Sequence, residues 1–279
     1  MKSAFITGAA TGIGEGLVLK LQAEGWRVYA GFRSAAPEAT RWHGLPNIVP
    51  LRCDVQSLGD IKSAVDCITT EEGQLDLLIN NAGYPGNSGV IEAADIDDYR
   101  KTFEINFWGP LNVAQAFMPL LRKAKGRVVN TTSASVYLTI PMGSSYPVSK
   151  VALKALSNHM RMEMAPFGVD VTSLEPGGVE TPMTALGEDV GAMQWATIPE
   201  SLRGQYQQFF LDGATAIGDN FKLYSAKHFA DQVYKKIILP KRTKPSYLIG
   251  PGAAALPWLH RLLPTQQVMN IWGRMFSKK

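Results

Sequence analysis

The sequence contains few residues that bind metals or form disulfides. Its 279 residues include two cysteines, Cys53 and Cys67, and four histidines. Neither set has the spacing of a metal site or a disulfide framework, so we expect no metal and a reducing cytoplasmic location. No apolar run reaches about 18 residues, which excludes a membrane-spanning helix. The first residues continue directly into a predicted strand, so we expect no signal peptide.

Acidic residues are scarce toward the C-terminus. From Lys222 to Lys279 there are eleven Lys and Arg residues and one acid, Asp231, whereas the preceding part has seventeen basic and twenty-three acidic residues. A basic, apolar tail suits a membrane surface or an anionic substrate, and it equally suits a packed end with solvated lysines. We expect no nucleic-acid partner.

Apolar runs alternate with helical patterns along the whole chain. Predicted strands cover residues 2–7, 28–33, 47–51, 75–79, 126–132, 169–174 and 246–249. Strands separated by helices are typical of a doubly wound α/β fold with a parallel sheet. With 46% hydrophobic residues, the chain is expected to form one such domain over residues 1–279.

A glycine-rich turn follows the first predicted strand and precedes a helix. Gly8, Gly12 and Gly14 form a Gly-x-x-x-Gly-x-Gly pattern that includes Thr11 and Ile13. Glycines let the backbone approach a pyrophosphate, and the helix N-terminus offers free N–H groups. The context of strand, turn and helix therefore predicts nucleotide binding.

The second predicted strand lacks an acid at its end. Dinucleotide folds often place an acid there to hold the ribose 2′-OH. This chain has Phe32 and Arg33 instead, and an arginine suits a 2′-phosphate. The sequence thus favours NADP(H) over NAD(H), although Arg33 could also be an ordinary surface arginine.

Three further strand ends carry small or polar residues. Asp54 is expected either to accept a hydrogen bond from an adenine amino group or to cap a helix near Ser57. Residues 80–83 suit close passage of a ligand or form a simple turn. Residues 176–181 lie at the same carboxyl edge, where such folds bind ligands, and Thr181 there could hold a nicotinamide amide.

Tyr146 and Lys150 are four residues apart, which places them on one face of a helix that begins near Ser144. A tyrosine with a pKa of about 10 needs a shift of about three units, or roughly 4 kcal/mol, to exchange protons near neutral pH. A cation about 4 Å away supplies roughly that much at an effective dielectric of about 20. Ser133 ends the preceding strand and could polarise a carbonyl oxygen. The trio predicts proton transfer to a carbonyl, although a Tyr-x-x-x-Lys pair alone is a weak signal.

Poorly periodic and amphipathic segments occupy the rest of the chain. Residues 96–107 have helical spacing, and Trp108-Gly109-Pro110 is expected to interrupt it beside Asn106. Residues 183–221 lack clear periodicity and are expected to form an apolar lid over a lipophilic substrate. The extension over residues 251–279 has apolar helical faces broken at Pro264, which suit domain packing, a flap on the substrate cleft or a membrane surface.

These motifs together resemble the short-chain dehydrogenase/reductase family over residues 1–249. The resemblance implies that Tyr146 is the general acid/base, that Lys150 binds the nicotinamide ribose and lowers the tyrosine pKa, that Ser133 positions the substrate oxygen, and that Asn106 supports a proton-relay water. It implies a seven-stranded parallel sheet and a homodimer or homotetramer. The implied cofactor-binding residues are Gly8, Thr11, Gly12, Ile13, Arg33, Asp54, Val55, Asn80, Ala82, Gly83, Tyr146, Lys150, Pro176, Gly177, Val179 and Thr181.

Within this family the chain looks most like the branch that includes 17β-hydroxysteroid and retinol dehydrogenases and acyl-dihydroxyacetone-phosphate reductases. Thr11 stands where many NADP-preferring members have a basic residue, so the cofactor prediction depends on Arg33. We therefore expect an NADP(H)-dependent oxidoreductase that interconverts a carbonyl and an alcohol in a lipophilic substrate. The alternatives are an NAD(H)-dependent member and a non-enzymatic NADP(H)-binding protein.

Overall fold

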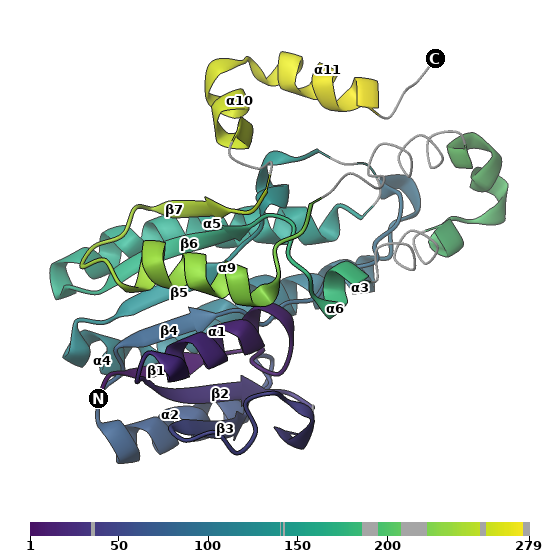
Figure 1. Cartoon of the computed structure of the whole chain (residues 1–279). Helices are drawn as coiled ribbons and strands as arrows, with labels where there is room; N and C mark the ends of the chain where they lie inside the picture. Colours follow the sequence, from purple (N-terminus) through teal and green to yellow (C-terminus); the bar gives the residue numbers. More distant parts are fainter. Residues whose placement is uncertain are drawn as a thin grey trace.

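The computed structural model describes residues 1–34, 37–139, 141, 143–185, 195–207, 222–251 and 255–275. Its centre is a seven-stranded sheet in the order β3-β2-β1-β4-β5-β6-β7, with every neighbouring pair parallel (Figure 1). The strands are β1 (Ser3–Ile6), β2 (Arg27–Phe32), β3 (Ile48–Arg52), β4 (Leu77–Asn80), β5 (Arg127–Thr131), β6 (Asp170–Pro176) and β7 (Ser246–Ile249). The predicted doubly wound fold is confirmed, and each predicted strand ends within two residues of the observed one.

Helices cover both faces of this sheet. The helices α1 (Gly12–Ala23) and α9 (Ala226–Val233) pack on one face, while α2 (Leu58–Glu72), α4 (Gly109–Ala124) and α5 (Ser145–Met164) pack on the other. The alternation of side chains along β1 explains the two layers, because Ala4 and Ile6 join one core and Phe5 joins the other. A parallel sheet buried on both faces therefore needs strands that are apolar throughout.

Short elements connect these layers. They are η1 (Pro37–Ala39), η2 (Ile91–Ala93), α3 (Ile96–Phe103), η3 (Glu104–Trp108), η4 (Ala134–Tyr137), η5 (Ala165–Phe167), α6 (Pro182–Ala185) and η6 (Tyr234–Ile238). The expected interruption at Trp108-Gly109-Pro110 is wrong in form, since α3 continues through the π-helical turn η3 directly into α4. Pro110 is tolerated because it lies at the start of α4, where its missing N–H costs little. Asn106 lies inside the π turn.

The predicted lid is described only in part, because residues 186–194 and 208–221 lie outside the described residues. Residues 200–207 are helical, and the Tyr206 hydroxyl donates a hydrogen bond to Glu92 in η2. A Cβ on Gly89 would lie 2.4 Å from Thr197 Oγ1. The described part of this segment therefore lies against residues 89–92.

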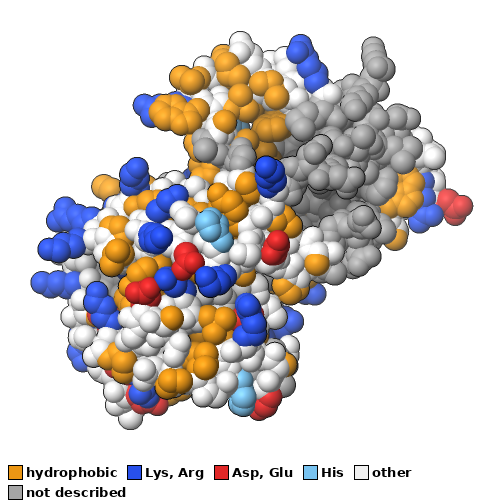
Figure 2. All heavy atoms as spheres, viewed as in Figure 1, with side chains coloured by type: hydrophobic (Ala, Val, Ile, Leu, Met, Phe, Trp, Pro, Cys, Tyr) orange, Lys and Arg blue, Asp and Glu red, His pale blue; other side chains and the backbone are white. Residues whose placement is uncertain are grey.

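Two helices form the C-terminal extension, α10 (Leu256–Leu262) and α11 (Thr265–Met275), and they separate at Pro264 as expected. Figure 1 places them beyond β7, outside the two helical layers. Hydrophobic side chains gather on their surface in Figure 2, and Trp258 and Leu262 are 57% and 72% exposed. In the part of the chain that the structure describes, no helix is long and apolar enough to span a membrane.

Candidate active site

The four predicted catalytic residues come from three segments that meet beyond the carboxyl ends of β4 and β5. Ser133 follows β5 and caps η4, with its Oγ accepting a hydrogen bond from Ser135 N at 3.0 Å. Tyr146 and Lys150 occupy the first turns of α5, which begins at Ser145 so that Pro147 falls in the first turn. Asn106 lies in η3, which contacts α5.

Lys150 is a buried cation directed toward the tyrosine. Its side chain is 3% exposed, its Nζ lies 5.6 Å from the Tyr146 ring centre, and it donates a hydrogen bond to Thr131 O at 3.0 Å. Burial lowers the pKa of Lys150 to about 8 because the ammonium loses its hydration. Part of the Lys150 population is therefore neutral near pH 8.

The pKa of Tyr146 is set by two opposing causes in the described chain. Burial raises the pKa of the phenol above its ordinary value, and a hydrogen bond with Ser133 lowers it in part. The net direction is upward, so the Coulomb effect of Lys150 expected from the sequence does not dominate in the protein alone. The effect of Ser133 on this pKa nevertheless requires that its hydroxyl lies near the Tyr146 phenol.

Asn106 joins the π turn to the loop after β4 and to α5. It is fully buried, its Nδ2 donates to Tyr84 O at 2.9 Å and to Ser149 Oγ at 3.0 Å, and its Oδ1 accepts from Tyr84 N at 2.8 Å. A Cβ on Gly83 would lie 3.5 Å from both Asn106 Oδ1 and Lys150 Nζ. The side chain of Asn106 thus fixes the loop that faces Lys150.

The glycine turn between β1 and α1 is shaped for close approach. Gly8 has a φ of +64°, and a Cβ there would lie 2.8 Å from Ala82 Cα. Thr11 precedes α1 without a capping side-chain hydrogen bond, so the first amides of α1 remain available to an anion. Ile13 packs against the core beneath the turn. This arrangement fits a pyrophosphate.

The segment after β6 reaches the same turn. A Cβ on Gly12, whose φ is +56°, would lie 2.9 Å from Thr181 Cγ2. The Thr181 side chain itself accepts a hydrogen bond from Thr184 N at 3.1 Å in α6, Val179 is buried, and Gly177 N pairs with Ile249 O beside Pro176. The structure therefore brings Thr181, at the end of this segment, beside the glycine turn.

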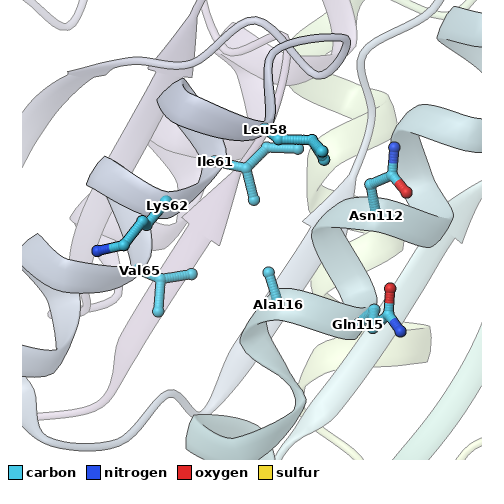
Figure 3. A pocket seen from close by; sticks show the side chains of 7 residues that line it. All are labelled: Leu58, Ile61, Lys62, Val65, Asn112, Gln115 and Ala116. Atoms are coloured by element: carbon cyan, nitrogen blue, oxygen red, sulfur yellow. The ribbon is translucent and has the colours of Figure 1, made fainter.

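Two hollows accompany these elements. One of about 480 Å³ adjoins the glycine turn and the Thr181 segment, and its lining residues are Ala10, Thr11, Gly12, Glu15, Ala39, Arg41, Glu180, Thr181, Pro182 and Ala226. The other, of about 290 Å³, lies between α2 and α4 and is shown in Figure 3, lined by Leu58, Ile61, Lys62, Val65, Asn112, Gln115 and Ala116. None of the four predicted catalytic residues lines either hollow. The first hollow is lined by the predicted cofactor-binding residues Thr11, Gly12 and Thr181, so it is the one that adjoins the candidate cofactor site.

The ends of β2 and β3 carry the remaining predicted cofactor residues. Arg33 is exposed, and no ion pair of Arg33 is found among the described residues. Asp54 Oδ1 accepts a hydrogen bond from Gln56 N at 3.0 Å, whereas Ser57 is the residue that caps α2, so the capping alternative for Asp54 is wrong. Val55 is buried against Gly109.

Asn80 and Asn81 have different roles in the loop after β4. The Asn80 side chain donates to Pro110 O at 3.1 Å and to Asn130 Oδ1 at 2.9 Å inside the core, which leaves its backbone as the part able to face a ligand. Asn81, which the sequence analysis did not assign a role, donates from Nδ2 to Thr7 O and Gly8 O, both at 3.1 Å. Only its place in the Asn-Asn-Ala-Gly turn could have indicated this function.

A second set of contacts holds the glycine turn, and the sequence pattern did not predict it. Trp42 is buried and donates from Nε1 to Ala9 O at 2.9 Å. Arg41 donates from Nε to Glu15 Oε2 at 2.8 Å. These partners are 26 and 33 residues apart, so no local pattern links them. In the described ranges, no group of three or more His, Cys, Asp and Glu residues could hold a metal ion.

Comparisons with known proteins agree with this geometry. A family model described as short chain dehydrogenase matches residues 2–189. An NADPH-dependent 1-acyldihydroxyacetone phosphate reductase of Schizosaccharomyces pombe is 35% identical over 283 residues, covering 99% of this chain and 86% of that protein. A probable short-chain type dehydrogenase/reductase of Helicobacter pylori is 32% identical over 270 residues, covering 94% of this chain and 93% of its own length.

A solved structure matches over the full length of the chain. It is a short chain dehydrogenase from Burkholderia cenocepacia in complex with NADP, with a TM-score of 0.74, 25% identity and 100% coverage of both chains. The family model and the two relatives are matched by sequence, independently of the site geometry, and all three are dehydrogenases or reductases. The chain belongs to the short chain dehydrogenase family.

Proposed function

We propose that the protein is an NADP(H)-dependent oxidoreductase that interconverts a ketone or aldehyde and an alcohol in a lipophilic substrate. The observation that carries the proposal is the convergence of Ser133, Tyr146 and buried Lys150 at the carboxyl edge of the sheet that also bears the glycine turn. Bound NADP(H) supplies or accepts the hydride in such a reaction. The residues of the chain must then bind the substrate oxygen and move one proton.

The residues around the glycine turn fit a dinucleotide. Gly8 and Gly12 lack the Cβ that would fill the space beside Ala82 and Thr181, and the N-terminus of α1 offers uncapped amides to the pyrophosphate. Ala82, Gly83, Asp54 and Val55 line the adenosine side in this proposal. Lys150, Pro176, Gly177, Val179 and Thr181 hold the nicotinamide half.

Each catalytic side chain has a chemical role in the proposal. Tyr146 Oη donates the proton to the nascent alkoxide in reduction and removes it in oxidation. Ser133 Oγ orients the substrate oxygen toward that phenol. Lys150 Nζ binds the nicotinamide ribose, and its positive charge favours the tyrosinate that remains after proton donation. Asn106 keeps the loop of Tyr84 and Gly83 in place and supports the water through which the proton is replaced.

Arg33 supports NADP(H) over NAD(H). It directly follows β2 and has no acidic neighbour in sequence, and its side chain is exposed. A guanidinium binds a phosphate by two parallel hydrogen bonds. The relative from Schizosaccharomyces pombe is named as NADPH-dependent, and the matched solved structure contains NADP. These names agree with the assignment made from Arg33.

The lipophilic substrate class is supported by the relatives that share the fold. Their names specify 1-acyldihydroxyacetone phosphate, and also retinol in a Mus musculus protein 34% identical over 213 residues, which covers 75% of this chain and 67% of that protein. The apolar composition of residues 183–221 points to the same class. A probe panel therefore consists of palmitoyl-dihydroxyacetone phosphate, retinal, estrone and, as a small polar control, acetone.

The decisive experiment has two stages. NADPH and NADH are titrated separately while the nicotinamide fluorescence is followed, and NADPH oxidation is then measured with each panel member. We expect tight NADPH binding and turnover of a lipophilic carbonyl but not of acetone. Binding of NADPH without turnover of any panel member would favour a non-enzymatic NADP(H)-binding protein, and preference for NADH would remove the NADP assignment.

The proposal includes a cytoplasmic location and a homo-oligomeric state. Free Cys53 and Cys67 fit a reducing cytoplasm. Exposed Trp108, Val148 and Val151, on the contacting elements η3 and α5, fit a homodimer or homotetramer interface, and sedimentation of the purified chain tests this. The proposal also takes residues 1–279 to form one domain.

Peripheral membrane contact through the extension is proposed from its exposed apolar side chains. Flotation with anionic liposomes should carry the full chain. A Trp258→Ser, Leu262→Ser double variant should remain at the bottom, because both side chains are exposed and the basic residue Arg261 lies between them in sequence. Equal flotation of both proteins would show that these two side chains do not contact the membrane.

A further inference from the structure

A second polar cluster lies next to the proposed catalytic residues without belonging to them. The Tyr137 hydroxyl donates a hydrogen bond to Glu175 Oε2 at 2.9 Å and accepts one from Lys154 Nζ at 2.6 Å. Lys154 Nζ also forms an ion pair with Glu175 Oε1 at 2.8 Å. Because Tyr137 ends η4, Lys154 lies in α5 and Glu175 lies in β6, the cluster joins three elements that surround the site.

The buried Lys154–Glu175 ion pair sets the electrostatics of the cluster. The Glu175 side chain is completely buried, and a buried carboxylate is stable only when it is paired and hydrogen-bonded. Burial lowers the pKa of Lys154, but its hydrogen bonds to Glu175 and Tyr137 outweigh burial and raise that pKa above its ordinary value. Burial likewise raises the pKa of Tyr137. At neutral pH Lys154 is therefore an ammonium and Tyr137 a neutral phenol.

Tyr137 is also one end of the short helix that Ser133 begins. Ser133 caps η4 at its start, and three amides of this turn are hydrogen-bonded within it, namely Ser135 N to Ser133 Oγ, Val136 N to Ser133 O and Leu138 N to Ser135 O. The turn is only four residues long, so a displacement at Tyr137 shifts Ser133 as well. The cluster anchors the far end of this turn to α5, one helical turn beyond Lys150.

The C-terminal extension is attached to the same turn. The Nε2 atom of His260, in α10, lies 2.7 Å from Tyr137 O. The ring centres of the two residues are 5.8 Å apart. Among the described elements, α10 packs against η4. The extension thus contacts the carbonyl of Tyr137, and the buried ion pair holds its hydroxyl.

We propose that Tyr137 is a positioning residue, which fixes the turn bearing Ser133 through Lys154 and Glu175 and couples the C-terminal extension to the substrate site through His260. The inference depends on the proposed function, since it takes Ser133 to orient the substrate oxygen. It assigns to the extension a role inside the protein that its sequence left open. Loss of the Tyr137 hydroxyl leaves the Lys154–Glu175 pair in place, so it releases the turn without exposing an unpaired charge.

Three variants and one control test the proposal. Tyr137→Phe removes the hydroxyl, His260→Ala removes the attachment of α10, and His260→Gln restores a side chain able to donate to Tyr137 O. Arg261→Ala is the matched control, because Arg261 is the next residue in α10 and is exposed. Each protein is examined by hydrogen–deuterium exchange over residues 133–139, by NADPH titration, and by kcat and KM for the fastest carbonyl of the probe panel.

We expect the three bonded amides of the turn to exchange about fivefold faster or more in Tyr137→Phe. Exchange in β5 and β6 should be unchanged. A misplaced serine lowers kcat, by about 10- to 100-fold, while the NADPH dissociation constant stays constant. His260→Ala should show a smaller change of the same kind, His260→Gln should recover, and Arg261→Ala should resemble the unmodified chain.

Two results would overturn the inference. Unchanged exchange over residues 133–139 in Tyr137→Phe would show that the cluster does not hold the turn, whatever the kinetics show. Faster exchange with an unchanged kcat would show that the turn does not position Ser133. Failure of the proposed function can be distinguished from failure of this inference. In the first case the unmodified chain would turn over no panel member, and the exchange measurement would still decide whether the cluster holds the turn.

Discussion

The Nζ of Lys150 lies 5.6 Å from the ring centre of Tyr146, in a position where the ammonium is almost fully buried. One hydrogen bond, to Thr131 O, compensates the charge in the described chain. A buried ammonium with so little compensation destabilises the folded protein. The burial of Lys150 therefore lowers the stability of the folded protein by an amount that can be measured.

Lys150→Met should stabilise the protein and flatten its pH dependence. The folded-state pKa of Lys150 is about 8 and the unfolded value is about 10.4, so the unfolded chain binds more protons between these values and stability rises with pH there. For the unmodified chain this contribution to the unfolding free energy should grow by about 2 kcal/mol from pH 7 to pH 10. Urea unfolding of both proteins across that range isolates the contribution as their difference.

The matched control for that experiment is Lys62→Met, because the Lys62 side chain is 75% exposed. Its curve should run parallel to that of the unmodified chain. Parallel curves for Lys150→Met as well would show that Lys150 titrates normally in the folded state.

Tyr146→Phe should lower kcat by about 10²- to 10⁴-fold, which is the contribution of a general acid/base. The NADPH dissociation constant should change little, since the substitution removes one hydroxyl and leaves Lys150 and the glycine turn intact. Tyr247→Phe, which removes a hydroxyl that accepts a hydrogen bond from Lys244 N near the start of β7, is the control. Comparable turnover in the two variants would reject Tyr146 as the acid/base.

Arg33→Ala should weaken NADPH binding selectively. Hydrogen bonds to a charged group contribute about 1.5–3 kcal/mol, which corresponds to about 10- to 100-fold in the NADPH dissociation constant. The NADH dissociation constant should be unaffected because NADH lacks the 2′-phosphate. Arg100→Ala in α3 removes an exposed arginine elsewhere, so an equal loss in both variants would indicate a general charge effect.

The fold could be predicted from the sequence because its signals are local. A buried parallel strand is a short apolar run, and the positive φ values of Gly8 and Gly12 show why the backbone requires glycine at these two positions. The relative placement of Ser133, Tyr146 and Lys150 followed from a strand end and one helix face. The strand boundaries and the grouping of these three residues could therefore be predicted from the sequence.

The surroundings of the site could not be predicted in the same way. Tyr137 meets Glu175 across 38 residues and Lys154 across 17, and Trp42 reaches Ala9 across 33. Asn106, in the π turn, bonds to Tyr84 and Ser149, each more than 20 residues away. Such contacts depend on how the layers pack, which periodicity does not encode.

Gly14→Ala tests how tightly the glycine turn is closed against the loop after β4. A Cβ on Gly14 would lie 2.1 Å from Gly8 O and 2.7 Å from Asn81 Nδ2, so the turn must open and the Asn81 hydrogen bonds that hold it must lengthen. We expect a loss of about 2–3 kcal/mol in the unfolding free energy, typical of overpacking, together with weaker NADPH binding.

The control for Gly14→Ala is Gly59→Ala, in α2. There the nearest atom to a new Cβ is Ser57 Oγ at 3.8 Å, and alanine favours a helix over glycine by about 0.5–1 kcal/mol. Urea unfolding should therefore show the two substitutions changing stability in opposite directions. If Gly14→Ala were as stable as Gly59→Ala and bound NADPH normally, the close approach of the glycine turn to Asn81 would not be needed for the cofactor site.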